Sequence, residues 1–193
     1  MDRNKILYNI QRNEIVSIKL PNPIDLQITG INKLDIFKKK VPQTGGDCIE
    51  VKTTKALITY LNEHFTYATN FREKEVFNEF TATYPTERLA ILKTVIIDGQ
   101  FGVAENGSVW INDSNFPNRL IPFITEVLVL CLNSEQIVSD MHEAYIKINN
   151  DITGFGVFMS GPSKTSDIEQ HLVYGAHGAK KLIVIIYHEN VVE

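Results

Sequence analysis

The chain has 193 residues, of which 44% are hydrophobic and 22% are charged, and its formal net charge is −4. This composition is typical of a globular protein with one sizeable core or at most two small domains. The negative charge gives no general attraction for nucleic acid or anionic membranes. No apolar run approaches the roughly 20 residues that span a bilayer, and the N-terminus lacks the features of a signal peptide. We therefore expect a cytoplasmic protein with no membrane span.

The first part of the chain contains a segment of alternating charged and apolar residues, followed by the start of an α/β pattern. Residues 2–18 place apolar side chains between charges, which predicts an amphipathic helix that Pro21 and Pro23 end. The elements then expected are a helix over Lys33–Lys40, a strand over Asp47–Val51, a helix from Thr53 or Thr54 to His64, a short strand over Tyr67–Thr69, helical turns over 73–80 and Glu87–Leu92, and a strand over Thr94–Asp98. This alternation predicts a mainly parallel sheet.

The middle of the chain changes character. Asn106-Gly107 is a strong turn signal and predicts a β-hairpin between Val103 and Val109. The elements expected after it are a central strand over Phe123–Leu132, a helix from Glu135 to about Ile148 capped by Asn133 or Ser134, and a strand over Phe155–Met159. We see no linker or repeat. The prediction is an N-terminal helical or extended segment over residues 1–29, followed by a single α/β domain over residues 30–193 with helices flanking the sheet and a β-hairpin insertion.

The stretch from Phe155 to Tyr187 reads as strand, polar turn, short helix, glycine stop and strand. The two apolar runs suit strands of a sheet that is covered on both faces. Ser166 with Glu169 three residues later fits a capping box at a helix start, and Gly175 fits the left-handed residue that ends a helix. A helix N-terminus after Gly161-Pro162-Ser163 would favour a bound anion, because free N–H groups and the helix dipole both attract negative charge.

Three polar loops are candidates for a ligand site, namely Ala104–Ser108, Asn112–Asn118 and Ser160–Asp167. In open α/β sheets, ligands bind beyond the carboxyl ends of the strands, where we expect these loops to gather. Glu105 could act there as a base, a nucleophile or a hydrogen-bond acceptor, or could be a solvent-facing turn residue. Lys164 could neutralise a phosphate or carboxylate, although it could also be an exposed loop lysine. Asp167 would repel an anion.

Other kinds of site find little support in the sequence. Ser108 and Ser163 offer hydroxyls but lie in no Gly-x-Ser-x-Gly motif. The five histidines show no metal-ligand spacing, and His177 fits a packing and hydrogen-bonding role better than a catalytic one. There is no Walker or dinucleotide-binding glycine motif. Cys48 and Cys131 lie far apart and predict buried thiols, and without a Cys-x-x-Cys the chain cannot hold an iron–sulfur cluster by itself. The cofactor is therefore unknown.

The residues SGPSKTSDIEQHLVYGAHGAKKLIVII resemble the C-terminal signature of the LUD-domain family, the lactate-utilisation proteins. The matching positions are Gly161, Pro162, Ser163, Lys164, Thr165, Ser166, Asp167, Ile168, Glu169, Gly175, His177 and Gly178. A shorter family block, an acidic or small residue followed by Thr-Gly-Thr, is present as Glu105-Asn106-Gly107-Ser108. The sequence departs from the family at Asn106, Ser108 and Ala179. The resemblance covers roughly residues 30–190.

The resemblance implies a fold like that of the ribose-phosphate isomerase and CoA-transferase group. It also implies a role in oxidising lactate to pyruvate, together with partner proteins that carry iron–sulfur modules. Its candidate ligand-binding residues are Asn106, Gly107, Ser108, Gly161, Ser163, Lys164, Thr165, Asp167 and His177, with Glu105 as the candidate catalytic residue. The ligand would be a small organic acid or another anion.

Two alternatives remain open at the level of sequence. The chain could be a stand-alone enzyme or binding protein for an anionic small molecule of the sugar-phosphate, CoA-ester or folate type. It could also be a regulatory or assembly protein without a ligand. Whether the domain catalyses a reaction is not decided by the sequence.

Overall fold

The computed structural model describes residues 32–80, 84–149, 154–166 and 172–189, together with the isolated positions 3 and 8. The predicted helix over residues 2–18 and the boundary at residue 29 fall almost entirely outside the described residues. Both therefore stay predictions.

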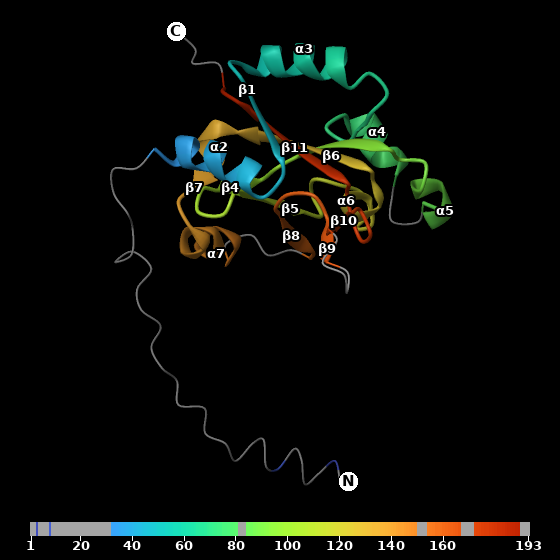
Figure 1. The fold of residues 1–193 in the computed structure, drawn as a ribbon. Coiled ribbons are helices and arrows are strands. Elements are labelled where there is room, and N and C mark those ends of the chain that lie inside the picture. Colours follow the sequence, from blue (N-terminus) through green and yellow to red (C-terminus); the bar gives the residue numbers. More distant parts are fainter. Residues whose placement is uncertain are drawn as a thin grey trace.

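A five-stranded parallel sheet forms the centre of the molecule (Figure 1). Its order is β1 (Asp47–Val51), β11 (Lys181–Tyr187), β6 (Val127–Asn133), β3 (Thr94–Asp98) and β2 (Thr69–Asn70). Adjacent strands are paired in register, for example Ile185 with both Ile49 and Cys131. The inner strands consist of β-branched and other apolar residues because both of their faces are buried. The predicted mainly parallel α/β fold is confirmed.

Helix α3 (Thr54–His64) covers one face of this sheet, with Leu57 and Leu61 packed on Ile96, Val129 and Ile185 (Figure 1). The helix begins where the Thr53 side chain accepts a hydrogen bond from the amide of Ala56, as the sequence predicts. The shorter helices α4 (Lys74–Glu79) and α5 (Thr86–Leu89) lie between β2 and β3 in sequence.

The opposite face carries α2 (Lys33–Gln43) and a second sheet (Figure 1). This sheet has the order β7 (Ile137–Val138), β4 (Phe101–Val103), β5 (Ser108–Asn112) and β8 (Gly156–Met159). Strands β4 and β5 form the predicted hairpin. Phe37 and Val41 of α2 are fully buried beside Leu132 and Val184, so the core continues between the two sheets.

Three expectations about individual elements are wrong. The central strand begins at Val127, because Ile121–Ile124 form the short helix α6 before it. The helix expected from Glu135 begins instead at Met141 (α7, Met141–Asn149), because Ile137 and Val138 pair with β4 after the short 3-10 helix η2 (Ser134–Gln136). Strand β8 belongs to the second sheet and is half-buried along its length, rather than covered on both faces.

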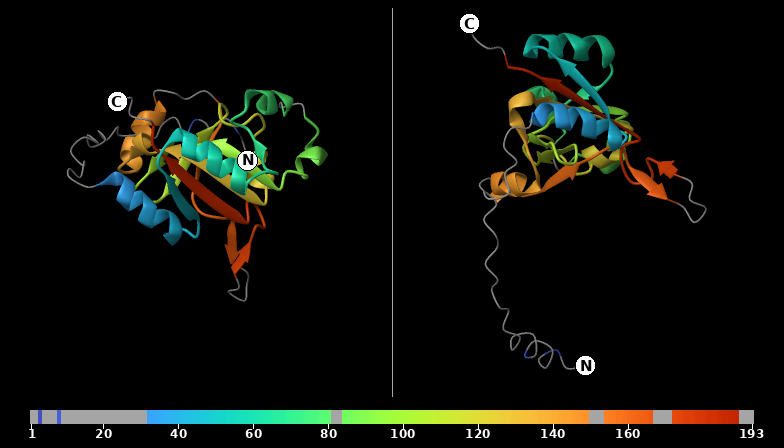
Figure 2. Two further views of the ribbon diagram at one scale, coloured as in Figure 1. Left: turned by 90° about the horizontal axis from the view of Figure 1, so that it is seen from above. Right: turned by 60° about the vertical axis from the view of Figure 1, so that its left-hand side comes forward.

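The predicted helix from Ser166 to Gly175 is also wrong in the part that the structure describes. Ser166 ends strand β9 (Lys164–Ser166), which pairs antiparallel with β10 (Leu172–Tyr174). Figure 2 shows this hairpin projecting away from the rest of the domain. The capping-box residue Glu169 falls outside the described residues. Gly175 does have the expected positive φ of 79°, but it follows a strand and not a helix.

Candidate functional site

The Glu105–Ser108 loop is the tight turn between β4 and β5. The Asn106 side-chain oxygen accepts hydrogen bonds from the amide and the hydroxyl of Ser108, at 3.0 and 2.7 Å. Ser108 is only 2% exposed. Gly107 has a φ of 68°, and a Cβ at this position would lie 2.8 Å from the amide nitrogen of Val41 in α2. The turn therefore packs closely against the last turns of α2, where only glycine fits.

Glu105 is exposed and tied to the start of helix α7. Its carboxylate accepts a hydrogen bond from the Met141 amide at 3.1 Å, and its own amide donates to the Ser139 carbonyl at 3.0 Å. A carboxylate at a helix N-terminus satisfies a free N–H group and interacts favourably with the dipole. Glu105 thus has a structural role in addition to any role as a base or ligand contact, and its catalytic role stays a prediction.

The Ser160–Lys164 loop reaches the same end of α2. Gly161 has a φ of 68° and leaves no room for a side chain against the Thr44 carbonyl. The Lys164 ammonium donates to that same carbonyl at 2.6 Å, and the Ser160 hydroxyl donates to the Asn106 carbonyl at 3.4 Å. The structure therefore brings the two sequence blocks together, side by side at the C-terminus of α2.

The remaining predicted ligand residues lie next to this junction. The Ser163 amide donates to the Ala179 carbonyl at 2.8 Å, and its carbonyl accepts from the Gly175 amide. Thr165 is in β9, opposite Val173. His177 is exposed. Asp167 lies outside the described residues.

The position of this junction differs from the sequence-based expectation in two respects. Gly45-Gly46 immediately precedes β1 and Ala179 precedes β11, so the junction lies at the amino ends of parallel strands and not at their carboxyl ends. It is also built on a helix C-terminus, whose exposed carbonyls favour cations. Lys164 supplies such a cation. The helix start predicted here is therefore wrong for the described residues, because Lys164 and Ser166 lie in strand β9, whereas anion binding by these residues stays a prediction.

The carboxyl ends of the parallel strands carry a different set of polar side chains, which the sequence reading did not single out. On the α3 side, Arg72 follows β2 and pairs with Asp98 at the end of β3, with Nε and Oδ1 2.6 Å apart. Its guanidinium lies 6.0 Å from the ring centre of Tyr187. Burial raises the pKa of the Asp98 carboxyl, an effect that the charge of Arg72 only partly offsets.

On the α2 side of the same edge, side chains from three strand ends form a hydrogen-bonded chain. Ser134 Oγ lies 2.9 Å from His188 Nδ1, and His188 Nε2 lies 2.9 Å from Glu50 Oε1. Lys38 of α2 pairs with the other oxygen of Glu50. Hydrogen bonds from Lys38 and His188 lower the pKa of the Glu50 carboxyl. In the sequence, Glu50, Ser134 and His188 each lie within two residues of the end of a predicted strand, and no other pattern links them.

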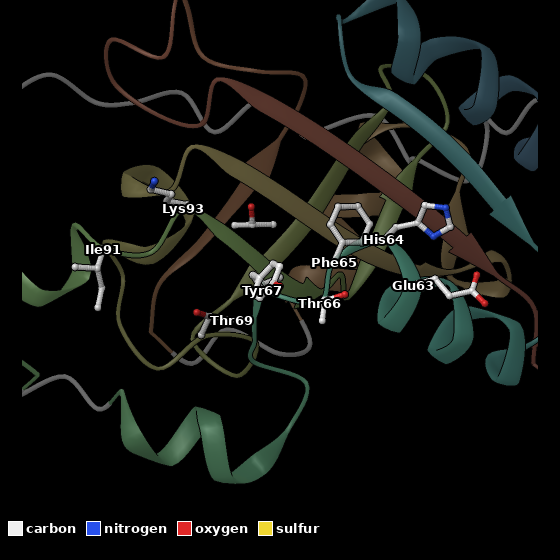
Figure 3. Close-up of a pocket in the computed structure, with 10 residues that line it drawn as sticks. Glu63, His64, Phe65, Thr66, Tyr67, Thr69, Ile91 and Lys93 are labelled. Carbon is white, nitrogen blue, oxygen red and sulfur yellow. The ribbon is translucent and has the colours of Figure 1, made fainter.

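A cavity of about 540 Å³ opens at the amino ends of β2 and β3, beside the end of α3 (Figure 3). Figure 3 shows Glu63 and His64 on one side, Ile91 and Lys93 on the other, and Tyr67 between them. Its volume is in the range of small-molecule sites, roughly 300–1,000 Å³. It contains none of the predicted site residues.

Cys48 and Cys131 are free thiols, and burial raises their pKa to about 11 and about 12. Among the described residues, no three His, Cys, Asp or Glu side chains are grouped so that they could hold a metal ion. In the same parts of the chain, no helix has both the length and the apolar character needed to cross a bilayer.

Curated proteins give partial matches at low identity. The chain is 25% identical over 97 residues to Lactate utilization protein C of Bacillus pumilus, covering 47% of this chain and 40% of the relative. It is 31% identical over 90 residues to the protein of the same name from Geobacillus kaustophilus, covering 44% and 38%. An uncharacterized protein of Neisseria meningitidis is 26% identical over 116 residues, covering 58% and 50%. The matches thus span half or less of these relatives' own length.

The fold is similar to that of a solved protein. The crystal structure of a DUF162 family protein from Deinococcus radiodurans matches with a TM-score of 0.61 and 14% identity, over 82% of this chain and 99% of that one. At this identity, the likeness supports the fold alone. The model of the LUD domain matches residues 32–187, which include the central sheet, the second sheet and the junction at the end of α2. The chain therefore belongs to the LUD domain family.

Proposed function

We propose that this chain acts in lactate utilisation, as an accessory protein in the oxidation of lactate to pyruvate. The observation that carries the proposal is the similarity to relatives named Lactate utilization protein C, within a domain whose family model matches most of the chain. The contact between the Glu105–Ser108 and Ser160–Lys164 loops supports it, because the two blocks that resemble the family form one surface.

We further propose that iron–sulfur proteins are its partners. Oxidation of lactate to pyruvate releases two electrons, which an acceptor must take up. The two cysteines of this chain cannot supply the four thiolates that usually hold a cluster. An iron–sulfur acceptor would therefore be carried by another chain.

The test of the pathway is growth on lactate. A clean deletion should grow normally on glucose and poorly on lactate, and the intact gene should restore growth. Complementation with Glu105→Gln tests the junction, and Glu79→Gln, which makes the same change at an exposed carboxylate of α4, is the matched control. Normal growth of the deletion strain on lactate as sole carbon source would refute the proposal.

The partnership has its own test. Affinity purification from lactate-grown cells under anaerobic conditions should recover iron-containing proteins, detected by their visible absorption and by mass spectrometry. If the purified chain carries no partner and is instead stabilised in a thermal-shift assay by a sugar phosphate, an acyl-CoA or a folate, the stand-alone alternative is correct.

A further inference from the structure

Ser134, His188 and Glu50 come together at the carboxyl edge of the sheet from positions far apart in the sequence. Ser134 follows β6, His188 follows β11, and Glu50 lies near the end of β1. These are three adjacent strands of the parallel sheet. The carboxyl ends of parallel strands are where α/β folds usually place reacting groups. Nothing in the family resemblance points to these three residues.

The hydrogen bonds determine which ring nitrogen of His188 carries the proton. An ionised carboxylate can only accept hydrogen bonds, so the contact with Glu50 requires a proton on Nε2. In the neutral imidazole, Nδ1 then has a free lone pair, and the Ser134 hydroxyl must donate to it. The hydroxyl proton of Ser134 therefore points at a base.

Charges around the ring support this arrangement. Lys38 pairs with the second oxygen of Glu50, so the carboxylate stays ionised and fixed in position. The neighbouring Glu189 is bonded to the Asn133 side chain at 2.8 Å. The side chains of His188 and Glu50 are 37% and 33% exposed, and Ser134 is half-buried, so the three residues lie at the surface and not in the closed core.

We propose that Ser134 is a base-activated nucleophile that accepts acyl groups from esters or thioesters. Its Oγ attacks the acyl carbonyl while the hydroxyl proton moves to Nδ1 of His188. The bond to the alcohol or thiol then breaks, and the leaving group takes that proton. Water then attacks the acyl-serine carbonyl as the same nitrogen takes its proton; the acid is released, and the proton passes from Nδ1 to the Ser134 oxygen, which restores the hydroxyl. His188 is the general base, whereas Glu50 and Lys38 are positioning residues.

Position in the fold agrees with this role. Ser134 lies where the buried central strand β6 turns into a short helix, with Asn133 accepting a hydrogen bond from the Glu135 amide. A nucleophilic serine at a strand-to-helix turn, exposed at the top of a parallel sheet, is also the arrangement in α/β-hydrolases. This chain places Ser134 at such a turn without a Gly-x-Ser-x-Gly motif, so the absence of the motif from the sequence does not exclude a reactive serine.

The first test is labelling of the purified full chain with a fluorophosphonate, a probe that reacts with base-activated serines. We expect one labelled site, and peptide mass spectrometry should locate it at Ser134. Ser134→Ala should abolish labelling, whereas Ser114→Ala, which changes a serine bonded to Asn112, should not. His188→Gln should slow labelling by about 100-fold or more, the usual contribution of a general base. The rates at which the parent protein and these variants hydrolyse p-nitrophenyl acetate should rank in the same order as their labelling rates.

A conservative variant separates a positioning role of Glu50 from a purely structural one. Glu50→Gln keeps the shape of the side chain but removes the acceptor-only carboxylate, so it should slow labelling of Ser134, and Glu50→Asp should recover part of the rate. Circular dichroism of each variant controls for loss of the fold. A labelling rate at Ser134 that is unchanged in His188→Gln would overturn the proposal.

A second measurement does not depend on acyl chemistry. The variant Ser134→Cys places a thiol beside His188, and its alkylation by iodoacetamide should have a midpoint well below the free-thiol pKa of about 8.5. The variant Ser114→Cys is the matched control. Cys48 and Cys131 give little background near neutral pH, since burial raises their pKa to about 11 and about 12. Equal midpoints in the two variants would show that His188 does not activate position 134.

Discussion

Single residues in the junction have roles that their sequence position did not reveal. Glu105 caps helix α7, and Lys164 bonds the Thr44 carbonyl at the end of α2. The sequence identified both as polar residues on loops. It could not identify their partners, which lie 36 and 120 positions away. A ligand at this junction would compete with bonds that already stabilise the fold, so variants at these two positions need a stability measurement beside any activity assay.

Asp113 provides a test of electrostatics at this scale. Both of its carboxylate oxygens accept hydrogen bonds from Arg119, and one also accepts from the Phe155 amide. The Arg119 bonds are the main reason why the pKa of Asp113 lies below its usual value of about 3.9. A lowered pKa in the folded state means that the ionised carboxylate stabilises the fold above about pH 4, and that this contribution disappears as the pH falls through the folded-state pKa.

We expect Asp113→Asn to be less stable than the parent protein at pH 6, with the difference shrinking below about pH 4 as the parent protein loses its own charge. Urea unfolding at a series of pH values measures this. Glu79→Gln, which neutralises an exposed carboxylate of α4, is the control. A difference that stays constant from pH 6 to pH 3 would contradict the assignment.

At the scale of elements, two helix predictions failed for the same reason. Ser166 and Glu169 have the spacing of a capping box, yet Ser166 pairs with Leu172 in a hairpin. Ile137 and Val138 fit a helical pattern, yet they pair with β4. Short apolar segments are compatible with either helix or strand, and strand partners distant in sequence decide between them.

The close contact of Gly161 with α2 gives a prediction for this scale. Gly161→Ala should destabilise the protein by at least about 1–2 kcal/mol, because the left-handed backbone is costly for alanine and the new Cβ meets the fixed Thr44 carbonyl. Gly175→Ala is a matched control, since it also has a positive φ but faces the flexible Lys180 side chain. Chemical denaturation should show the larger loss for Gly161→Ala, and an equal or smaller loss would argue against the contact.

At the scale of the whole molecule, the core between the two sheets holds the domain together. Leu130 of the central strand is fully buried, among residues from the parallel sheet, the second sheet and α2. Truncation of such a side chain leaves a cavity in addition to the lost burial. The sequence predicted this strand as central because its residues are almost continuously apolar.

Leu130→Ala should therefore cost about 2–5 kcal/mol of unfolding free energy. Ile58→Ala on α3, where the side chain is 51% exposed, should change it by no more than about 0.5 kcal/mol. Guanidinium unfolding of both variants, followed by circular dichroism, gives the comparison. A loss below 1 kcal/mol for Leu130→Ala would mean that the core is packed differently around β6.

The sequence by itself determined the fold class, the strands β1, β3 and β11, helix α3 with its Thr53 cap, and the Asn106-Gly107 hairpin. Each depends on local patterns, namely runs of apolar residues, capping side chains and turn residues, which act over a few positions. These signals are visible without knowledge of the partners.

Only the tertiary structure decided which loops and strand ends lie next to one another. It placed the Glu105 and Lys164 loops at the C-terminus of α2, and it brought Ser134, His188 and Glu50 together. The physical reason is that strand order and connection handedness, and not local propensity, set the neighbours of a strand end. Residues separated by 54 and 138 positions carry no pattern that announces their contact, so the candidate nucleophile emerged only from the folded chain.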